Sequence, residues 1–523
     1  MPGSPARPAD TAVAPPRTPP RGTIGPAPLR IENPGTGALL QELASATSGD
    51  VSEAVARARA AQPAWARLSV RERGQALRRV SGRLLRVEEV IETIVRERGK
   101  PRYEAEGIEV FYTCELTRFL TGRKGRRALA DDVRRPFVFA YKRARVVQHP
   151  HGVVGVIGPW NWPLLNNYAD CVAPLLAGNA VVLKPSQVTP LTSLRIQAIW
   201  RELGLPPDVF QVLPGGAEVG EALVEAADMV FFTGSEAAGR KVARRCGERL
   251  IPCVLELGGK SPFIVLADAD VEAAARALVW GSFANSGQVC VRPERVLVEA
   301  PVADRFTAAC AAAMERLRQD PDPGGVQTDV DVGAMTFRPQ IAHVEALIQD
   351  AVAGGARVLR GGSARGDLPG RFFAPTLISG ATSQMRVMRE EVFGPVLAIA
   401  AVDSAEQAIA MANEGGRGLS GSVWSGDAAR ARAVARRLET GAVCVNDVLV
   451  NYFVVEAPLG GVKGSGLGFR HGPEALKQFC RSETILENAP VLGRLSNLIR
   501  DQLGFPYQLR VLKLFRRLMR WLY

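Results

Sequence analysis

From about residue 50 onward, helical patterns of apolar residues alternate with short runs of β-branched and aromatic residues. The segment VSEAVARARAAQPAWARL at 51–68 repeats apolar residues at helical spacing. The later runs are short enough for buried strands; they include VVGVIG, AVVLK, MVFFT and PFIVL at 153–158, 180–184, 229–233 and 262–266. This alternation predicts an α/β protein with an open, doubly wound sheet. Small or polar residues follow each run, where such sheets bind ligands beyond the carboxyl ends of their strands.

Length and cysteine spacing narrow the class of protein. The chain has 523 residues, which corresponds to about three domains of ordinary size with ample capacity for a buried core. Its eight cysteines form no CxxC pair, and the four histidines lie at no zinc-like spacing from them. We therefore expect no metal site and a reducing compartment.

The N-terminal residues 1–27 are rich in Pro, Ala and Arg and contain no apolar run. This composition predicts a flexible arm rather than a signal peptide. No stretch of about 18 consecutive apolar residues, the length that a spanning helix needs, occurs anywhere in the chain. We expect a cytoplasmic protein without a spanning helix.

Glu256 and Cys290 are a carboxylate and a thiol set among small residues, in ELGGK and NSGQVC. A free thiol is mostly protonated at neutral pH, but its thiolate adds readily to a carbonyl carbon. If a nicotinamide then removes hydride from the adduct, a thioester remains, and a positioned carboxylate helps water to hydrolyse it. The pair therefore predicts a nucleophile and a general base. The alternative for Cys290 is a buried structural thiol, as most of the eight cysteines must be.

Both motifs resemble the signatures of the NAD(P)-dependent aldehyde dehydrogenase superfamily, and the resemblance extends over about residues 28–488. Further matching motifs follow in the expected order; they are VIGPWNWP at 156–163, GNAVVLKPS at 178–186, FFTGSEAAG at 231–239, EEVFGPV at 390–396 and PLGGVKGSGLG at 458–468.

The resemblance implies a three-part architecture. It places a Rossmann-type cofactor domain at 28–130 and 150–257, an α/β catalytic domain at 258–455, and a small β oligomerisation element at 131–149 and 456–488. The segment PFVFAYKRARVVQHP at 136–150 reads as a strand pair with exposed edges. We therefore expect a homodimer or a homotetramer.

Cofactor contacts are expected where two strands end. Gly234 and Gly239 open a helix whose free amides can receive a phosphate, and Ser235 adds a hydroxyl. A plain helix start would show the same two glycines, but the resemblance implies a contact with the pyrophosphate of NAD or NADP. Lys184 would project from a strand end toward a ribose or phosphate, the alternative being a solvated lysine.

Ser186 and Gln187 are the residues expected to contact the adenosine end of the cofactor. Many NAD-preferring relatives carry Glu at the position of Gln187, where it binds the ribose hydroxyls. Because the missing carboxylate removes a repulsion against a 2'-phosphate, we predict that NADP is accepted.

The resemblance assigns the nicotinamide end to four residues. It points to Glu391 for the nicotinamide ribose, to Phe393 for a wall beside the ring, and to Trp160 for a flank of the cofactor. Asn161 would donate an amide hydrogen to the developing oxyanion, together with the backbone N–H of Cys290. Such a donor is typically worth a factor of about 100 to 1000 in rate. Alternatively, Trp160 and Asn161 only shape a loop beside a proline.

The aldehyde is less well specified. Apolar residues follow Asn161 and precede the glycine-rich loop, which favours a medium-chain, long-chain or aromatic aldehyde, unless these side chains fill ordinary core. They are Trp162, Leu164, Leu165, Tyr452, Phe453 and Val454. Arg292 either binds a substrate carboxylate, which would favour a succinate-semialdehyde-type substrate, or forms a salt bridge elsewhere. Asp170 stands where many relatives carry Lys, which puts a proton relay through this segment in doubt.

The tail at 489–523 lies beyond the resemblance and is strongly basic. Residues 490–523 contain seven basic residues and one acid, which accounts for +6 of the chain's net charge of +12. Arg510, Lys513, Arg517 and Arg520 share one helical face, and apolar residues recur at similar steps. This pattern predicts a basic amphipathic helix that contacts an anionic membrane surface peripherally. The alternative is a helix that packs on another subunit or caps the substrate entrance, whereas nucleic-acid binding is disfavoured by the interleaved aliphatic residues.

Three classes of function are compatible with the fold: a hydrolytic aldehyde dehydrogenase, a CoA-acylating relative, and a noncatalytic membrane-associated scaffold. Acylating enzymes do not need the water-activating carboxylate that this chain retains as Glu256. A scaffold has no reason to keep Cys290, Glu256, Asn161 and Lys184 together. We therefore expect hydrolytic oxidation of an aldehyde with NAD or NADP.

Overall fold

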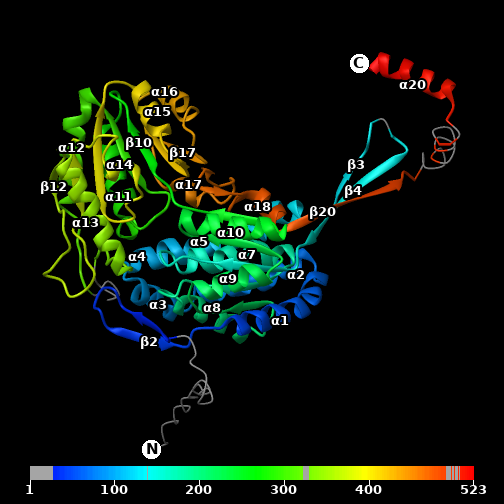
Figure 1. Ribbon diagram of the computed structural model, residues 1–523, viewed down its shortest axis with the longest axis horizontal. Helices are drawn as coiled ribbons and strands as arrows, with labels where there is room; N and C mark the ends of the chain where they lie inside the picture. The colour runs from blue at the N-terminus through cyan, green and yellow to red at the C-terminus, as the bar shows by residue number, and fades with distance from the viewer. Residues whose placement is uncertain are drawn as a thin grey trace, which may run out of the picture.

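The computed structural model describes residues 27–137, 139–321, 329–490, 496, 500, 504–505 and 507–522. The expected N-terminal arm lies outside these residues except for Ala27, and so does part of the basic tail. The predicted α/β class is confirmed, because helices surround two large and mostly parallel sheets (Figure 1).

The first large sheet has six strands in the spatial order β19–β9–β8–β5–β6–β7 and is parallel except at β19. In that order, the strands are Gly466–Leu467, Cys253–Glu256, Met229–Thr233, Val153–Ile157, Ala180–Lys184 and Phe210–Val212. The chain runs outward from β5 through β6 to β7 and then returns to β8 on the other side of β5. The neighbouring strands β5 and β8 therefore flank a topological switch point, where doubly wound sheets open a crevice.

Helices cover both faces of this sheet. Successive side chains of β5 point to opposite faces, so Val153 and Ile157 belong to one core cluster and Val154 and Val156 to another. The first face packs against α1 (Ser48–Arg67), α9 (Ala217–Ala226) and α10 (Glu236–Arg249). The second face packs against α2 (Val70–Leu84), α5 (Phe111–Leu120), α7 (Ala169–Ala177) and α8 (Leu191–Glu202). Shorter elements join these layers; they are α3 (Glu88–Arg98), α4 (Arg102–Glu104), η1 (Ala105–Val110), α6 (Arg123–Ala128) and η2 (Leu164–Tyr168).

The second large sheet has seven strands in the order β12–β13–β14–β11–β10–β16–β17, and only β12 is antiparallel. In that order, the strands are Arg357–Arg360, Thr376–Ser379, Val396–Val402, Pro293–Glu299, Ser261–Val265, Ser420–Trp424 and Ala442–Val445. Its helical elements are α11 (Val271–Phe283), η3 (Ala284–Gly287), α12 (Ala300–Met314), α13 (Arg338–Ala353), α14 (Arg386–Arg389), α15 (Ala405–Asn413), α16 (Ala428–Ala435) and α17 (Val450–Phe453). The chain passes from the first sheet to the second through the glycines between β9 and β10.

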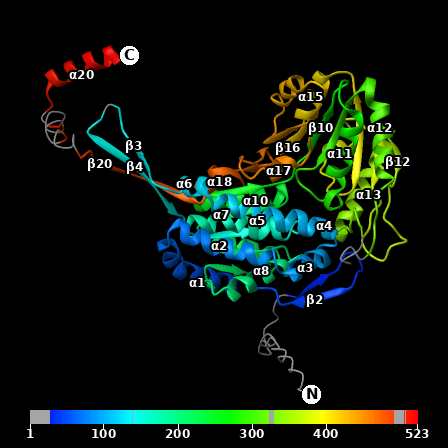
Figure 2. The same ribbon diagram turned by 180° about the vertical axis from the view of Figure 1, so that it is seen from behind.

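A third sheet projects from the body of the molecule (Figures 1 and 2). It consists of β3 (Asp132–Arg134), β4 (Lys142–Pro150) and β20 (Cys480–Asn488), and β4 pairs with both neighbours antiparallel. The strand pair expected at 136–150 is thus shifted, because β3 ends at Arg134 and only β4 lies in that segment.

The remaining elements are short or terminal. β1 (Leu29–Glu32) pairs with β2 (Leu39–Leu43), β15 (Arg417–Gly418) pairs with β18 (Val462–Lys463), and α18 (Gly472–Gln478) precedes β20. The predicted amphipathic helix is confirmed as α20 (Leu509–Leu522), which lies beyond the third sheet (Figures 1 and 2).

Candidate active site

Two loops converge at the switch point of the six-stranded sheet. The loop after β5 carries Trp160 and Asn161, and the loop after β8 carries Gly234 and Ser235. All four residues line one cavity of about 400 Å³, which also reaches Cys290. Because carboxyl ends of neighbouring parallel strands meet at one edge of a sheet, the topology itself brings these sequence-distant residues together.

Glu256 and Cys290 line this same cavity. Glu256 is the last residue of β9, and Cys290 lies in the turn between η3 and β11. The glycines after Glu256 permit the close approach: a Cβ at Gly258 would overlap the Glu391 carboxylate, and one at Gly259 would overlap the Cys290 carbonyl oxygen. The small residues of ELGGK are therefore explained by packing around the candidate base and nucleophile.

The Glu256 carboxylate is buried, and its Oε1 has no hydrogen-bond partner within the described chain. Burial raises its pKa to about 7; the nearby Arg470 guanidinium opposes this shift, and the Asp170 carboxylate adds to it. A carboxyl group with this pKa takes up and releases protons near neutral pH, which suits a general base.

Cys290 is half-buried, and desolvation of its thiol raises the pKa to about 12. Arg470 opposes this shift, whereas the acidic side chains of Glu391 and Glu256 reinforce it. The thiol is therefore protonated at neutral pH, and its use as a nucleophile requires that a base in the cavity accept its proton.

The turn that leads to Cys290 has an unusual backbone. Asn285, Ser286 and Gly287 have φ angles of 55°, 56° and 73°, in the left-handed region. A Cβ at Gly287 would overlap the backbone of Gly394, so only glycine fits there. Non-glycine residues in this region cost free energy and cluster at functional sites. The strained turn places the thiol at the cavity wall.

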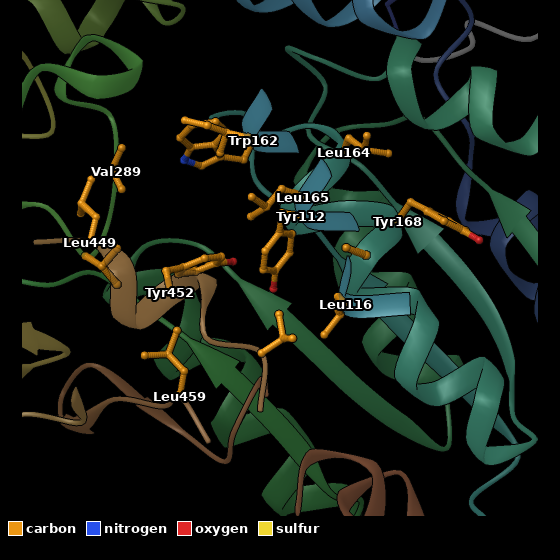
Figure 3. Packing of buried hydrophobic residues seen from close by; sticks show 14 of the residues in the cluster. Tyr112, Leu116, Trp162, Leu164, Leu165, Tyr168, Val289, Leu449, Tyr452 and Leu459 are labelled. Carbon is orange, nitrogen blue, oxygen red and sulfur yellow. The ribbon is translucent and has the colours of Figure 1, made fainter. Parts of the chain in front are cut away.

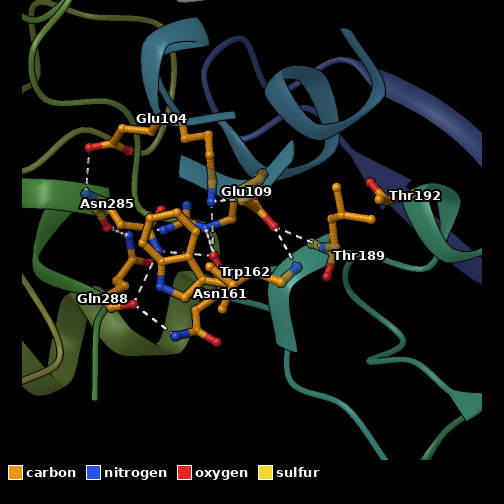
Figure 4. Close-up of polar contacts among 12 residues, drawn as sticks. Glu104, Glu109, Asn161, Trp162, Thr189, Thr192, Asn285 and Gln288 are labelled. Carbon is orange, nitrogen blue, oxygen red and sulfur yellow. Dashed lines mark hydrogen bonds and ion pairs between the residues drawn. The ribbon is translucent and has the colours of Figure 1, made fainter. Parts of the chain in front are cut away.

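Asn161 is held from both its backbone and its side chain (Figure 4). Its backbone carbonyl accepts hydrogen bonds from Arg98 Nε at 3.0 Å, Lys100 Nζ at 3.3 Å and Asn285 Nδ2 at 2.9 Å. Its side-chain Nδ2 donates to the Gln288 carbonyl at 2.9 Å. A primary amide has two hydrogens, so this bond leaves one available for a ligand. The sequence analysis missed Arg98 and Lys100, which carry no motif of their own.

Trp160 and Phe393 form two walls of the cavity. Their rings meet edge to face, with centroids 5.4 Å apart and an interplanar angle of 85°. Glu391 lies beside them and accepts the Gly259 N–H at 3.3 Å. Burial raises the pKa of Glu391 to about 7, and the Glu294 carboxylate reinforces the shift.

Three further lining residues were not expected from sequence, namely Phe337, Gln340 and His343. Gln340 Nε2 donates to the Val392 carbonyl at 2.8 Å, and His343 Nε2 lies 3.0 Å from the Glu391 carbonyl oxygen. These contacts fix the backbone of the EEVFGPV segment from the side of α13.

The N-terminus of α10, which the sequence predicts to receive a phosphate, borders the cavity. Ser235 is the N-cap of α10, and its hydroxyl accepts the Ala238 N–H at 3.4 Å. Gly239 lies outside the cavity lining, because it packs against the Leu257 side chain, which a Cβ would overlap. The N-terminus of α10 therefore borders the cavity through Gly234 and Ser235, while Gly239 allows the helix to approach the sheet.

The adenosine-end candidates do not line the cavity that contains Cys290. Lys184, the last residue of β6, is buried, which lowers its pKa to about 8, and the Glu218 carboxylate opposes this shift. Ser186 shapes the next turn, since its hydroxyl accepts the Val188 N–H at 3.3 Å. Gln187 is exposed and lines a neighbouring cavity of about 530 Å³ together with Glu218.

The two cavities share Phe337 and together fit a dinucleotide. The N-terminus of α10 suits the phosphates, and the wall formed by the touching rings of Trp160 and Phe393 suits a flat ring. Lys184 is a buried cation at the end of the neighbouring strand β6 and lines neither cavity. The candidate cofactor residues therefore form two groups, one beside Cys290 and one around Gln187.

Arg292 forms a structural salt bridge. Its guanidinium is fully buried, lies 3.0 Å from Glu294 Oε1, and donates to the carbonyl oxygens of Ser282 and Val396 at 3.2 and 3.1 Å. It lines neither the cofactor cavity nor the substrate passage described below. Of the two roles that the sequence left open for Arg292, carboxylate binding and a salt bridge, the structure shows the salt bridge.

Glu294 links that salt bridge to the cofactor cavity. Its carboxylate also accepts Lys260 Nζ at 2.7 Å and the backbone N–H groups of Val392 and Phe393 at 3.0 and 3.1 Å. The lysine of ELGGK therefore helps to position the wall formed by Phe393, although it does not contact the cavity.

Arg470 is the buried cation beside the candidate base, and the sequence analysis did not single it out. It pairs with Asp170 at 3.3 Å, donates to Thr233 Oγ1 at 2.8 Å, and contacts Asn166 Oδ1 and the Tyr452 hydroxyl. Asn166 and Thr233 line the cofactor cavity. Asp170 is the residue that could have pointed to Arg470 from the sequence, since a buried acid in place of a lysine requires a cationic partner from elsewhere in the chain.

A narrow apolar passage also reaches Cys290 and shares Cys290 and Asn166 with the cofactor cavity. Its volume is about 30 Å³, and it is lined by Ile108, Trp162, Leu165, Asn166, Trp280, Ala284, Val289, Cys290, Val291, Leu449, Tyr452 and Phe453. In Figure 3, Trp162, Leu165, Val289, Leu449 and Tyr452 surround the same space. Four of the six apolar residues expected near the substrate line it; Leu164 is in the core instead, and Val454 is exposed.

The passage opens outward into a larger cleft of about 770 Å³, with which it shares Ile108, Trp280 and Ala284. The cleft, the passage and the cofactor cavity thus form one route with Cys290 in the middle.

This fold and this site define an NAD(P)-dependent oxidoreductase with a cysteine and a carboxylate at the meeting point of two cavities. The aldehyde dehydrogenase family model matches residues 25–485. The chain therefore belongs to the aldehyde dehydrogenase family, and it is an NAD(P)-dependent aldehyde dehydrogenase.

Several relatives support this assignment. A Mycolicibacterium smegmatis protein, provisionally named an NADP(+) succinate-semialdehyde dehydrogenase, is 38% identical over 87% of this chain and 88% of its own length. A Methylomonas protein named 4,4'-diapolycopene aldehyde oxidase is 36% identical over 94% of this chain and 90% of its own length. The structure of a Mycobacterium tuberculosis aldehyde dehydrogenase complexed with NAD+ matches with a TM-score of 0.84 and 34% identity, covering 90% of this chain and 96% of that one.

Proposed function

We propose that this enzyme oxidises an apolar medium-chain, long-chain or aromatic aldehyde to the carboxylic acid, with water releasing the acyl group. The observation that carries the proposal is the lining of the passage to Cys290, which contains no Lys, Arg, Asp or Glu. Apolar substrates gain from the burial of their chains in such a lining, whereas a carboxylate would lose its hydration without gaining a cationic partner.

The proposed chemistry begins with Cys290. Its sulfur attacks the aldehyde carbon while the thiol proton passes to Glu256, whose pKa of about 7 suits it as the acceptor. The free amide hydrogen of Asn161 and the backbone N–H of Cys290 donate to the oxygen that becomes negative. When bound, NAD or NADP supplies the acceptor for the aldehyde's hydride.

The acyl group then remains on Cys290 as a thioester. Glu256 first releases to solvent the proton that it took from Cys290, and its carboxylate then removes a proton from a water molecule as the water oxygen adds to the thioester carbonyl. Collapse of this adduct breaks the carbon–sulfur bond, and Glu256 gives its proton to the departing sulfur, which releases the carboxylic acid and restores the Cys290 thiol. A CoA-acylating enzyme would not need Glu256 for this step.

We assign the two ends of the cofactor to the two neighbouring cavities. Trp160 and Phe393 form the wall beside the nicotinamide ring, and Glu391 binds its ribose. Gly234 and Ser235 present the start of α10 to the phosphates. Lys184, Ser186 and Gln187 serve the adenosine end. Because a neutral amide at Gln187 does not repel a 2'-phosphate, NADP is accepted as well as NAD.

Succinate semialdehyde is the second candidate, favoured by the names of several relatives. Arg102, Arg276, Arg316 and Arg318 line the outer cleft, whereas no cation lines the passage itself. A semialdehyde carboxylate held in the passage would therefore have no cationic lining residue to pair with. The apolar aldehyde is therefore the first choice.

We further propose that the enzyme is cytoplasmic and forms a homodimer or homotetramer through the third sheet. The supporting observation is apolar exposure on this sheet, where Val133, Ile485 and Leu486 are 46%, 43% and 64% exposed. Side chains of this kind on a projecting sheet favour contact with another copy. In this scheme, 28–130 and 150–257 bind the cofactor, 258–455 complete the catalytic domain, and 131–149 and 456–488 form the oligomerisation element.

The test is the initial rate of NAD(P)H formation with hexanal, decanal, benzaldehyde and succinic semialdehyde, using each cofactor in turn. Wild type is compared with Cys290→Ala and with a matched control, Cys310→Ala, whose thiol is buried elsewhere in the core. We expect oxidation of the apolar aldehydes by wild type and by the control, and none by Cys290→Ala. Activity confined to succinic semialdehyde would reject the apolar substrate, and activity retained in Cys290→Ala would reject the nucleophile.

A further inference from the structure

α20 separates cationic and apolar side chains completely enough to define two opposed faces. At 100° per residue, its five basic residues fall within an arc of about 120°. They are Arg510, Lys513, Arg516, Arg517 and Arg520. The opposite arc of about 180° contains only apolar residues, among them Leu514, Phe515, Leu518 and Trp521. No acidic residue occurs in the helix.

The apolar face of α20 is uncovered. No residue of the helix is buried, and Leu514 and Trp521 are 68% and 81% exposed. Phe505 and Tyr507, just before the helix, are also exposed, and their rings lie 4.5 Å apart. A continuous apolar surface of this kind on a protein in water indicates an interaction site.

The position of α20 limits what covers this face. The helix lies beyond the third sheet, at the opposite end of the molecule from α11 and α12, which contribute to the outer cleft (Figures 1 and 2). It therefore does not cap the substrate entrance of its own subunit, which was one of the roles open from sequence.

We propose that α20 docks the enzyme on the surface of an anionic lipid bilayer, with its axis in the plane of the membrane. The charge pattern favours lipid over a protein partner: a protein interface needs no exclusively cationic rim, whereas anionic headgroups attract every basic residue beside them. Trp and Phe on the apolar face suit the boundary between headgroups and acyl chains. No helix among the described residues is long and apolar enough to cross a membrane, so the contact is peripheral.

The consequence for function rests on the proposed substrate class. Apolar aldehydes partition into membranes, so an enzyme docked there meets them at a higher local concentration than in water. The docking itself does not depend on that class, and it is tested without any substrate.

The first experiment measures binding of the full-length protein to vesicles of phosphatidylcholine with and without phosphatidylglycerol. We expect co-sedimentation only with the anionic vesicles, and release at high ionic strength. In Arg516→Glu/Arg520→Glu, partition should fall at least about 30-fold, because each basic residue near an anionic surface strengthens binding about five-fold. The matched control, Arg71→Glu/Arg86→Glu, makes the same change in net charge at two exposed positions, one in the first turn of α2 and one just after its end, and should bind as wild type does.

A second readout follows the apolar face. Trp521 fluorescence should shift to shorter wavelength on anionic vesicles, and this shift should be absent in Trp521→Phe. Oxidation of benzaldehyde in solution should be unchanged in the charge variant, which separates a failure of docking from a failure of the enzyme.

Two outcomes would overturn the proposal. One is equal sedimentation of wild type and Arg516→Glu/Arg520→Glu with anionic vesicles. The other is a smaller oligomer for Leu518→Asp in light scattering without vesicles, which would assign the apolar face to a second copy of the chain.

Discussion

We predict that the titration of Glu256 sets the acid side of the enzyme's pH profile. Its pKa is raised to about 7 by burial, so the carboxylate form that acts as the base is lost as pH falls through that value. The ionised fraction is about 0.1 at pH 6 and about 0.9 at pH 8. If deacylation limits turnover, kcat therefore rises about ten-fold between those two pH values.

Arg470 and Asp170 act on this pKa in opposite directions. The guanidinium of Arg470 lowers the pKa of Glu256, and the carboxylate of Asp170 raises it. Arg470→Gln should therefore move the acid limb of kcat to higher pH, and Asp170→Asn should move it to lower pH. A shift of one unit in Arg470→Gln would reduce the ionised fraction at pH 7 from about a half to about a tenth, which is about five-fold in rate.

The assay is stopped-flow recording of the burst and the steady state of NAD(P)H formation across the pH range, with one apolar aldehyde. Glu256→Gln should leave a slow steady state without an acid limb. Glu391→Gln is the control, because Glu391 also has a pKa of about 7 but is proposed to bind the nicotinamide ribose. The assignment fails if wild-type kcat is flat between about pH 6 and 8, or if both ion-pair variants move the limb the same way. If the acid limb moved in the same direction in both variants, the cause would be disruption of the structure that the Arg470–Asp170 ion pair supports.

Three further predictions concern single side chains. Asn161→Ala should lower kcat about 100- to 1000-fold while the cofactor's dissociation constant, measured by fluorescence titration, changes little; a fall of less than about five-fold would remove Asn161 from the oxyanion site. Gln187→Glu should lower the ratio of kcat/KM for NADP over NAD by about ten-fold or more, because a carboxylate would face the 2'-phosphate; wild-type discrimination far below 0.1 for that ratio would already contradict acceptance of NADP. Glu294→Gln should lower the free energy of unfolding in denaturant by about 3 to 5 kcal/mol, because it leaves Lys260 and Arg292 buried without their carboxylate. The exposed pair control, Glu406→Gln, should cost at most about 1 kcal/mol, and equal losses would refute the buried-triad interpretation.

The sequence by itself determined the elements whose causes are local. The β-branched runs became β5, β6, β8 and β10 because short apolar segments between glycines and polar turns have few other ways to be buried. The 3.6-residue repeat in the tail predicted α20, because only a helix gathers its basic residues on one face and its apolar residues on the other. The candidate nucleophile and base were also recognisable, because glycines beside a thiol or a carboxylate mark positions where the backbone must approach closely.

Only the tertiary structure decided how distant residues combine. Arg470 lies 214 positions after Glu256, yet β19 pairs with β9 and brings this guanidinium beside the base. Arg292 is two residues from the thiol but turns into the core to meet Glu294. Gly239 belongs to a phosphate-binding motif but serves the packing of α10.

The physical reason is that pKa values and side-chain directions depend on burial and on neighbours from other strands. Desolvation is the largest cause of the raised pKa of both Glu256 and Cys290, and it exists only once two sheets and their helices have closed around them. Local patterns therefore identified which residues carry the chemistry, and packing determined in which protonation state and direction they meet a ligand.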